Sequence, residues 1–190
     1  VTNYGQIAKS TDGLVCTYGA IGNFAVTDER IAKLAVYSTT PTANGTMYAI
    51  SNKNAYRTTT TNFGDWPADS PTPWPNYPVG DVLIDNGYIM VVNNIIGTST
   101  FMRYKYINGG TWQVSQPFGE AFNKTQIVPF GNRYIIFTTG TKFISATKQT
   151  SPSTTNPPFI NASIVNQFSE PVSIGVAWND LSTPVLYAII

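Results

Sequence analysis

The chain has 190 residues, a net charge of +1 and only 11% charged residues. This length suits one well-filled hydrophobic core, so we expect a single all-β domain over residues 1–190. Without a run of Lys or Arg, the near-neutral charge gives little attraction to a polyanion. We therefore expect neither a nucleic acid nor an anionic membrane surface as a partner.

Cysteine and histidine are almost absent, since Cys16 is the only cysteine and there is no histidine. This excludes an internal disulfide, a multi-cysteine metal site, zinc ligation by histidine and a Ser-His-Asp triad. We expect no metal and no cofactor. Cys16 is interpreted as a small buried apolar residue. No apolar run reaches the roughly 20 residues of a membrane helix, so no membrane span is expected, and the first residues do not read as a signal peptide.

Short apolar, aromatic and β-branched segments recur along the chain, separated by clusters of Gly, Asn, Pro and Asp. This pattern predicts strands, and only the stretch at 27–38 could form a helix instead. The predicted strands lie at 24–28, 33–38, 46–51, 88–93, 101–107, 133–139, 142–147, 172–178 and 185–190.

Two kinds of turn suggest a repeated unit. The pattern Asn-x-Gly-x-Trp occurs at 62–66 and again, 46 residues later, at 108–112. Gly-Thr or Ser-Thr dipeptides separate pairs of apolar strands, and a further apolar segment precedes each pair. We predict about four repeats of roughly 43–50 residues, the size of a propeller blade. The dipeptides are Gly45-Thr46, Gly97-Thr98, Gly140-Thr141 and Ser182-Thr183, and the preceding segments are 24–28, 82–84, 126–128 and 163–165.

A four-bladed β-propeller is the favoured fold. An N-terminal strand at 4–10 would close it by pairing with the last repeat, which would cover two open sheet edges at once. The alternative is a β-sandwich or jelly roll whose terminal strand is donated to a neighbouring subunit.

The two Asn-x-Gly-x-Trp turns resemble shortened Asp-box turns of sialidase-like propellers, with Asn where Asp is usual. In that family the turn is a structural signature that lies away from the active centre, so the resemblance implies a fold and not an activity. The run at 82–146 is also similar in style to the propeller domains of phage tail nozzle proteins.

The residues for catalysis are sparse, and we expect no enzyme. A sialidase-like site needs three arginines, and we interpret Arg103 and Arg133, two of the four in the chain, as surface strand residues. A glycoside hydrolase with two carboxylates is the catalytic alternative, because ten Asp and Glu are present. Several of these occupy turn-like contexts where Asp bonds locally: Asp12, Asp28, Asp85 and Asp180.

The segment WPADSPTPWPNYP at 66–78 is a candidate partner-binding loop. Its five prolines would stiffen the segment while Trp66, Trp74 and Tyr77 contact a sugar or another protein. In the alternative, these aromatic rings fold back over the core. Three Asn-x-Ser/Thr sequons mark candidate glycosylation sites at Asn44, Asn123 and Asn161.

The composition favours a non-catalytic structural or attachment component of a larger extracellular or virion assembly, such as a tail, surface protein or filament subunit. Its expected partners are copies of itself or other assembly proteins. The alternative is a lectin-like, carbohydrate-binding module with surface glycans as partners. In either case the expected location is extracellular or on a virion surface.

Overall fold

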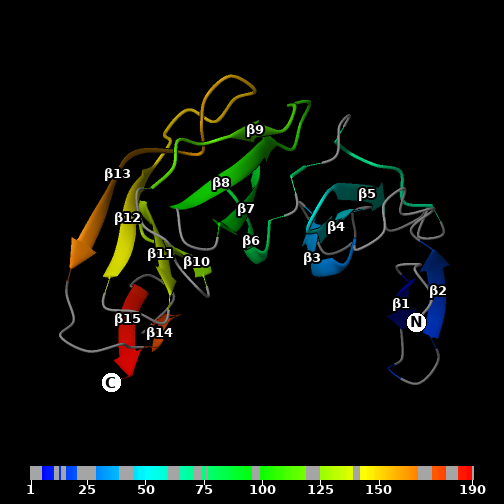
Figure 1. Ribbon diagram of the computed structural model, residues 1–190, viewed down its shortest axis with the longest axis horizontal. Coiled ribbons are helices and arrows are strands. Elements are labelled where there is room, and N and C mark those ends of the chain that lie inside the picture. The colour runs from blue at the N-terminus through cyan, green and yellow to red at the C-terminus, as the bar shows by residue number, and fades with distance from the viewer. Residues whose placement is uncertain are drawn as a thin grey trace. The chain divides into compact units, whose positions relative to one another are not determined.

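The computed structural model shows an all-β chain, as expected (Figure 1). It describes residues 6–10, 13, 16–20, 29–38, 45–59, 65–70, 74–75, 77–95, 99–118, 125–138, 142–166, 173–178 and 184–189. Within these ranges every regular element is a strand, and the strands form antiparallel sheets. The stretch at 27–38 that could have been a helix contains the strand Ile31–Tyr37.

The backbone packs into two compact units, Val1–Tyr77 and Pro78–Ile190. The first contains β1 (Gln6–Ser10), β2 (Cys16–Ala20), β3 (Ile31–Tyr37), β4 (Thr46–Ser51) and β5 (Ala55–Thr59). The second contains β6 (Val79–Asp85), β7 (Tyr88–Ile95), β8 (Ser99–Tyr106), β9 (Gln113–Val114), β10 (Thr125–Phe130), β11 (Arg133–Thr138), β12 (Lys142–Lys148), β13 (Phe159–Asn166), β14 (Ser173–Trp178) and β15 (Pro184–Ile189). That the whole chain is one domain stays a prediction.

The N-terminal strand predicted at 4–10 contains β1, which forms an antiparallel hairpin with β2. Gln6 lies opposite Ala20, and Ser10 lies opposite Cys16. β2 was not predicted from the sequence. Residues 4 and 5 lie outside the described residues, and pairing of β1 with the last repeat or with a neighbouring subunit stays a prediction.

A second sheet of the first unit has the order β3-β4-β5. The chain then returns alongside β5, because Arg57 N donates to Pro67 O at 3.1 Å and Asp69 N donates to Ala55 O at 2.7 Å. An isolated bridge joins Tyr56 to Ala68. Residues 67–69 therefore act as a short fourth strand of this sheet.

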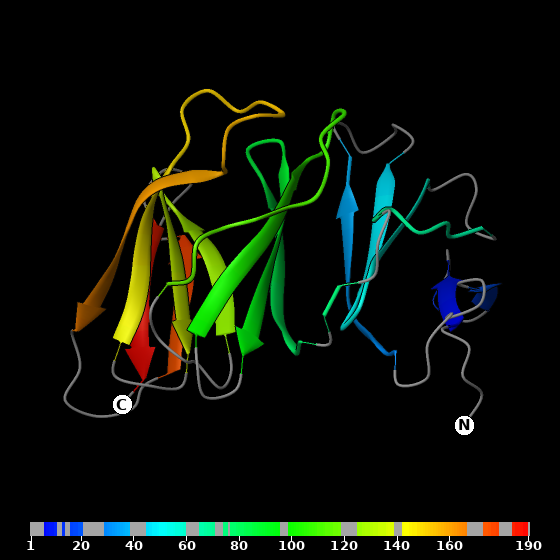
Figure 2. The same ribbon diagram turned by 45° about the horizontal axis from the view of Figure 1, so that its top comes forward.

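The second unit contains two four-stranded meanders, β6-β7-β8-β9 and β10-β11-β12-β13, which stand side by side in Figure 2. β10 begins at Thr125, 46 residues after β6 begins at Val79. The first hairpin of the earlier meander turns through Asn86 and Gly87, whose φ angles are 50° and 78°. Two successive positive φ angles match the twist of paired strands, and Asn-Gly adopts them readily.

The main hydrophobic core lies between these two meanders. Ring contacts in this core include Tyr88 against Tyr104 and Tyr106, both edge to face. A smaller cluster of Ile135, Phe137 and Phe143 lies on the other face of the β10–β13 sheet. The main core comprises Tyr88, Met90, Val92, Met102, Tyr104, Ile127, Tyr134, Ile136 and Ile144.

The strand pattern corrects part of the predicted repeat. The Asn-x-Gly-x-Trp motif at 108–112 lies between β8 and β9, and Trp66 of the other motif lies between β5 and the 67–69 strand. The motif at 108–112 thus joins the third and fourth strands of its sheet, whereas residues 62–64 of the other motif lie outside the described residues. The Gly-Thr dipeptides are not equivalent. Thr46 of the first dipeptide begins β4, the second strand of its sheet. Residues 97–98 lie outside the described residues, but the strands on either side of them, β7 and β8, are the second and third of their sheet. The segment 163–165, assigned to the fourth repeat, belongs to β13 and pairs with β12.

The described strands do not close into a barrel or a propeller. What the structure establishes is an all-β fold with three antiparallel sheets of three or four strands, together with two separate hairpins, β1–β2 and β14–β15.

Candidate interaction surface

Large hydrophobic side chains are exposed on the outermost described strands of the three larger sheets. Leu34 and Val36 on β3 are 55% and 60% exposed, and Val114 on β9 is 58% exposed. Ile160 and Ile164 on β13 are also exposed. In the described part of the chain, β3, β9 and β13 each end a sheet. Single exposed hydrophobic residues are ordinary, but their concentration on sheet edges indicates a surface that another element can cover.

The exposed pair on β3 follows from the register of its sheet. Leu34 lies opposite Ala49, and Val36 lies opposite Met47, so all four side chains share one face. Trp66 covers part of this face by packing with Ala49 and Tyr56. The edge of the face at Leu34 and Val36 stays open to solvent.

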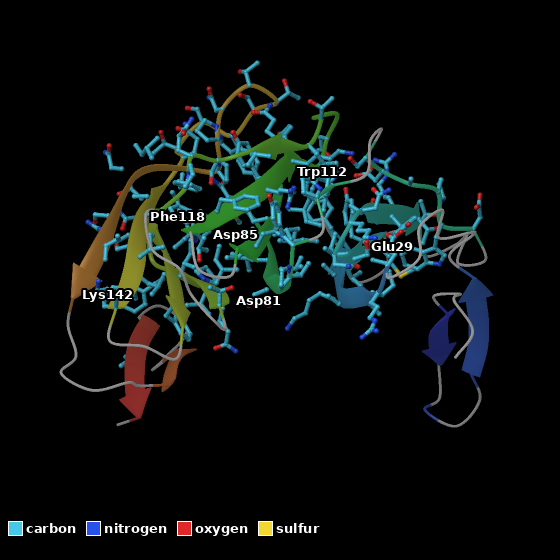
Figure 3. The ribbon with its side chains drawn as sticks, viewed as in Figure 1. Glu29, Asp81, Asp85, Trp112, Phe118 and Lys142 are labelled. Carbon is cyan, nitrogen blue, oxygen red and sulfur yellow. The ribbon has the colours of Figure 1, made fainter. Side chains whose placement is uncertain are left out.

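A groove of about 450 Å³ separates β13 from the segment that follows β9. Ser115 N donates to Met102 O and Phe118 N donates to Thr100 O, both at 2.8 Å, so this segment is held against β8. The rings of Phe118 and Phe159 lie 5.7 Å apart between their centroids, and Figure 3 labels Phe118. The groove is lined by apolar, aromatic and uncharged polar residues, among them Val114, Gln116, Phe118, Phe159, Ser163 and Ile164.

The side chains that line this groove limit the reactions that the groove could catalyse. It contains no Asp, Glu, His, Cys, Lys or Arg. Hydrolysis of a glycoside by the usual pair of carboxylates would therefore find no acid or base among these residues. Over all described residues, no group of three or more His, Cys, Asp or Glu could hold a metal ion. The groove is suited to binding an uncharged partner.

The structure buries both tryptophans of the segment 66–78, and the partner-binding role of this segment stays a prediction. Trp66 is 3% exposed and Trp74 is 8% exposed, so little of either ring faces solvent. The indole N–H of Trp74 donates to Ser70 Oγ at 3.1 Å. Both rings cover the core of the first unit, which is the alternative that the sequence left open. Tyr77 is half-buried.

One of the three predicted glycosylation sites is described. Asn161 is exposed on β13, with a φ of 51°, at a point where the register of β13 against β12 shifts. Its side chain is therefore accessible on an outer strand. Asn44 and Asn123 lie outside the described residues.

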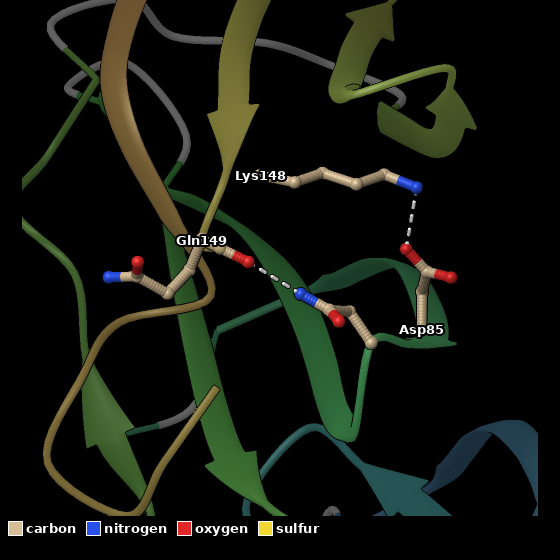
Figure 4. A network of polar contacts seen from close by, with 4 residues as sticks. Asp85, Lys148 and Gln149 are labelled. Carbon is tan, nitrogen blue, oxygen red and sulfur yellow. Dashed lines mark hydrogen bonds and ion pairs between the residues drawn. The ribbon is translucent and has the colours of Figure 1, made fainter. Parts of the chain in front are cut away.

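A polar network joins the two meanders of the second unit (Figure 4). Lys148 Nζ lies 2.8 Å from Asp85 Oδ2, and Asn86 Nδ2 donates to Gln149 O at 2.8 Å. Burial, together with the nearby Asp85 carboxylate, raises the pKa of the Tyr134 hydroxyl far above its ordinary value. The network fixes the turn between β6 and β7 against the end of β12.

The two arginines interpreted as surface residues differ. Arg103 is buried, with Nη1 donating to Asn93 Oδ1 at 2.7 Å and its guanidinium 4.8 Å from the centroid of the Phe101 ring. The surface interpretation is wrong for Arg103, because an amide and an aromatic face replace the water around its charge. Arg133 is exposed, as expected, and donates to Ser145 Oγ.

Polar contacts of the first unit gather around Glu29. Its Oε1 accepts hydrogen bonds from Tyr56 OH at 2.8 Å and from the Ser51 hydroxyl. Asn52 Oδ1 accepts from Arg30 N at 2.8 Å. These bonds hold the segment before β3 against the β4–β5 turn. Glu29 was not singled out from the sequence, because its partners are more than 20 residues away in the chain.

No protein-family model, curated protein or solved structure matches the chain. The described residues contain no helix with the length and hydropathy that a bilayer crossing requires.

Proposed function

We propose that the chain is a non-catalytic structural or attachment component of a larger extracellular or virion assembly, such as a tail, surface protein or filament. The observation that carries the proposal is the exposure of Leu34, Val36, Val114, Ile160 and Ile164 on outermost strands. Burying one such side chain completely contributes roughly 1.5–3 kcal/mol. Several contacts of this kind across copies are enough to support association between subunits.

The repeated meanders also support a more specific proposal for the fold. We infer that the repeats form blades of a four-bladed β-propeller related to the sialidase-like and tail nozzle propellers. Two four-stranded meanders that share a core and begin 46 residues apart are what neighbouring blades require. A chain of such blades presents many strand edges and loops to surrounding proteins.

The assembly proposal is tested by introducing charge at the exposed edges. The full chain is studied by light scattering over a range of concentrations, beside Val36→Lys on β3 and Ile164→Lys on β13. Each substitution would put a charge into a contact that excludes water, so we expect the mean mass in solution to fall toward 20.7 kDa. Thr150→Lys, at an exposed position outside the strands, is the matched control and should assemble as the parent does.

Two results would contradict the proposal. One is a parent chain that stays at 20.7 kDa at every concentration, both alone and with the other proteins of a reconstituted assembly. The other is assembly that both edge variants leave unchanged.

A second candidate function is supported by the groove between β13 and the segment after β9. Its aromatic rings and uncharged polar groups suit a neutral saccharide, whose rings stack on aromatic faces. A glycan screen of the full chain tests this role. Gln116→Ala, at an exposed polar group of the lining, should weaken any binding found, while Thr150→Lys should not.

A further inference from the structure

Two hairpins of the chain stand as two-stranded sheets. β1 pairs only with β2, and β14 pairs only with β15, within the described residues. The two meanders of the second unit have four strands each. An isolated two-stranded hairpin has marginal stability in water, so each hairpin gains from further pairing. The two hairpins together would make one sheet of four strands, the size found in each meander.

The β14–β15 hairpin lies against only part of the neighbouring sheet. β15 lies against β10, and β14 lies against β11. The apolar cluster on that face of the sheet continues beyond β11, through Phe143 on β12 to Val165 on β13. Because the sheet order is β10-β11-β12-β13, a strand added beside β14 would lie over β12, and a second would lie over β13. Among the described strands, the edge of β14 away from β15 is therefore the place where further strands would add.

The open edge of β14 lacks the usual protections against pairing. Its sequence, SIGVAW, has no charge and no proline, and neither has CTYGA of β2. Both hairpins also keep a regular register along their whole length. The exposed outer strands β3 and β13 differ, since register shifts interrupt the ladders of both. Bulges, charges and prolines are the means by which proteins block sheet edges, so β2 and β14 are the edges suited to accept a strand.

The other strand of each hairpin, β1 or β15, is less suited to pair with a further strand. β1 carries Lys9, and β15 begins with Pro184. A sheet with the order β15-β14-β2-β1 would place both of these strands on the outside, where charge and proline are tolerated.

We propose that the β1–β2 hairpin of one copy adds through β2 to the open edge of β14 in a second copy, completing a four-stranded sheet. This inference rests on the proposed role as an assembly subunit and names the joint between subunits. Main-chain hydrogen bonds across β2 and β14 supply the attraction. Each copy carries one donor hairpin and one acceptor edge, so the contact is head-to-tail and produces open filaments or closed rings.

Disulfide trapping in the full chain tests the joint, because Cys16 is the only cysteine and begins β2. Each residue of β14 is replaced by cysteine in turn, from Ser173→Cys to Trp178→Cys, and the protein is oxidised and run on a non-reducing gel. Residues opposite each other on paired strands have Cα atoms about 4.5–5.5 Å apart, within the range of a disulfide. One or two adjacent positions should therefore give a ladder of bands at multiples of 20.7 kDa.

Two controls separate this ladder from random oxidation. The same β14 variants carrying Cys16→Ser should give no band above a dimer, because each chain then has one thiol. Thr150→Cys places an exposed thiol outside the strands, away from the proposed joint, and should give no ladder. Circular dichroism and light scattering of the reduced variants establish that each folds and assembles as the parent does.

The possible results distinguish the joint from the proposed function. A position-dependent ladder supports the joint. An intrachain disulfide in a 20.7-kDa monomer overturns it, since the hairpin would then complete the sheet of its own chain. Assembly of the parent without position-dependent trapping overturns the joint and leaves the assembly role standing. A parent that neither assembles nor traps overturns both.

Discussion

Replacing Trp66 by alanine separates the two roles considered for the proline-rich segment. Trp66 is 3% exposed and packs on Ala49 and Tyr56, so its removal opens a cavity in the first unit. A buried indole covers roughly 150–250 Å², which corresponds to about 4–6 kcal/mol at about 25 cal/mol per Å². Because alanine keeps part of that contact, we expect Trp66→Ala to lower the free energy of unfolding by about 3–5 kcal/mol, the usual range for core tryptophans.

Amide hydrogen exchange measures this loss where it occurs. Since about 1.4 kcal/mol corresponds to a factor of ten, the slowest amides of β4 and β5 should exchange about 100 to 4,000 times faster in Trp66→Ala, up to the limit set by the total stability of the unit. Pro75→Ala, at an exposed position of the same segment, is the control and should change exchange by less than about threefold. If Trp66→Ala matched this control, Trp66 would contribute nothing to the core and the partner-binding role would regain support.

Three further predictions concern other sites. Burial, aided by Asp69, raises the pKa of Tyr48 from 10.0 to about 12. Because the unfolded chain releases this proton at a lower pH, the free energy of unfolding should fall as pH rises from 10 toward 12. Tyr48→Phe should flatten that fall in urea titrations. Gly110→Ala should cost about 1–3 kcal/mol in the same titrations, because its Cβ would lie 2.8 Å from Tyr106 O, whereas Gly131→Ala, with open space and a φ of 55°, should cost about 1 kcal/mol. In a eukaryotic secretory host, Ser163→Ala should remove the glycan-dependent gel shift contributed by Asn161; no change in the shift would mean that this sequon is not used.

Local chemistry determined much of the strand pattern. Short apolar, aromatic and β-branched runs bounded by turn residues identified strands such as 46–51 and 142–147 closely, because both signals are local in the sequence. Asn86-Gly87 fixed a tight hairpin for the same local reason. The sequence missed β2 and β5, whose short runs CTYGA and AYRTT have little apolar content of their own.

Which strand pairs with which was decided by tertiary structure. The segment 163–165 reads like the first strand of a new repeat, yet it pairs with β12, because its partner is chosen by packing and not by local sequence. The same limit applies to the equivalence of the Gly-Thr turns. A turn dipeptide records that the chain reverses, and it does not record between which strands.

Composition by itself determined that this is a β-rich chain without histidine chemistry or a disulfide, since these depend on which residues are present. Exposure was decided only by the tertiary structure. Trp66 and Val36 both lie in or beside apolar strand-like segments, but packing buries Trp66 and leaves Val36 60% exposed on an outer strand. Arg103 is likewise buried because Asn93 and Phe101 meet it across and along the sheet. A side chain's surroundings depend on residues distant in the sequence, and those are brought together only when the sheets assemble.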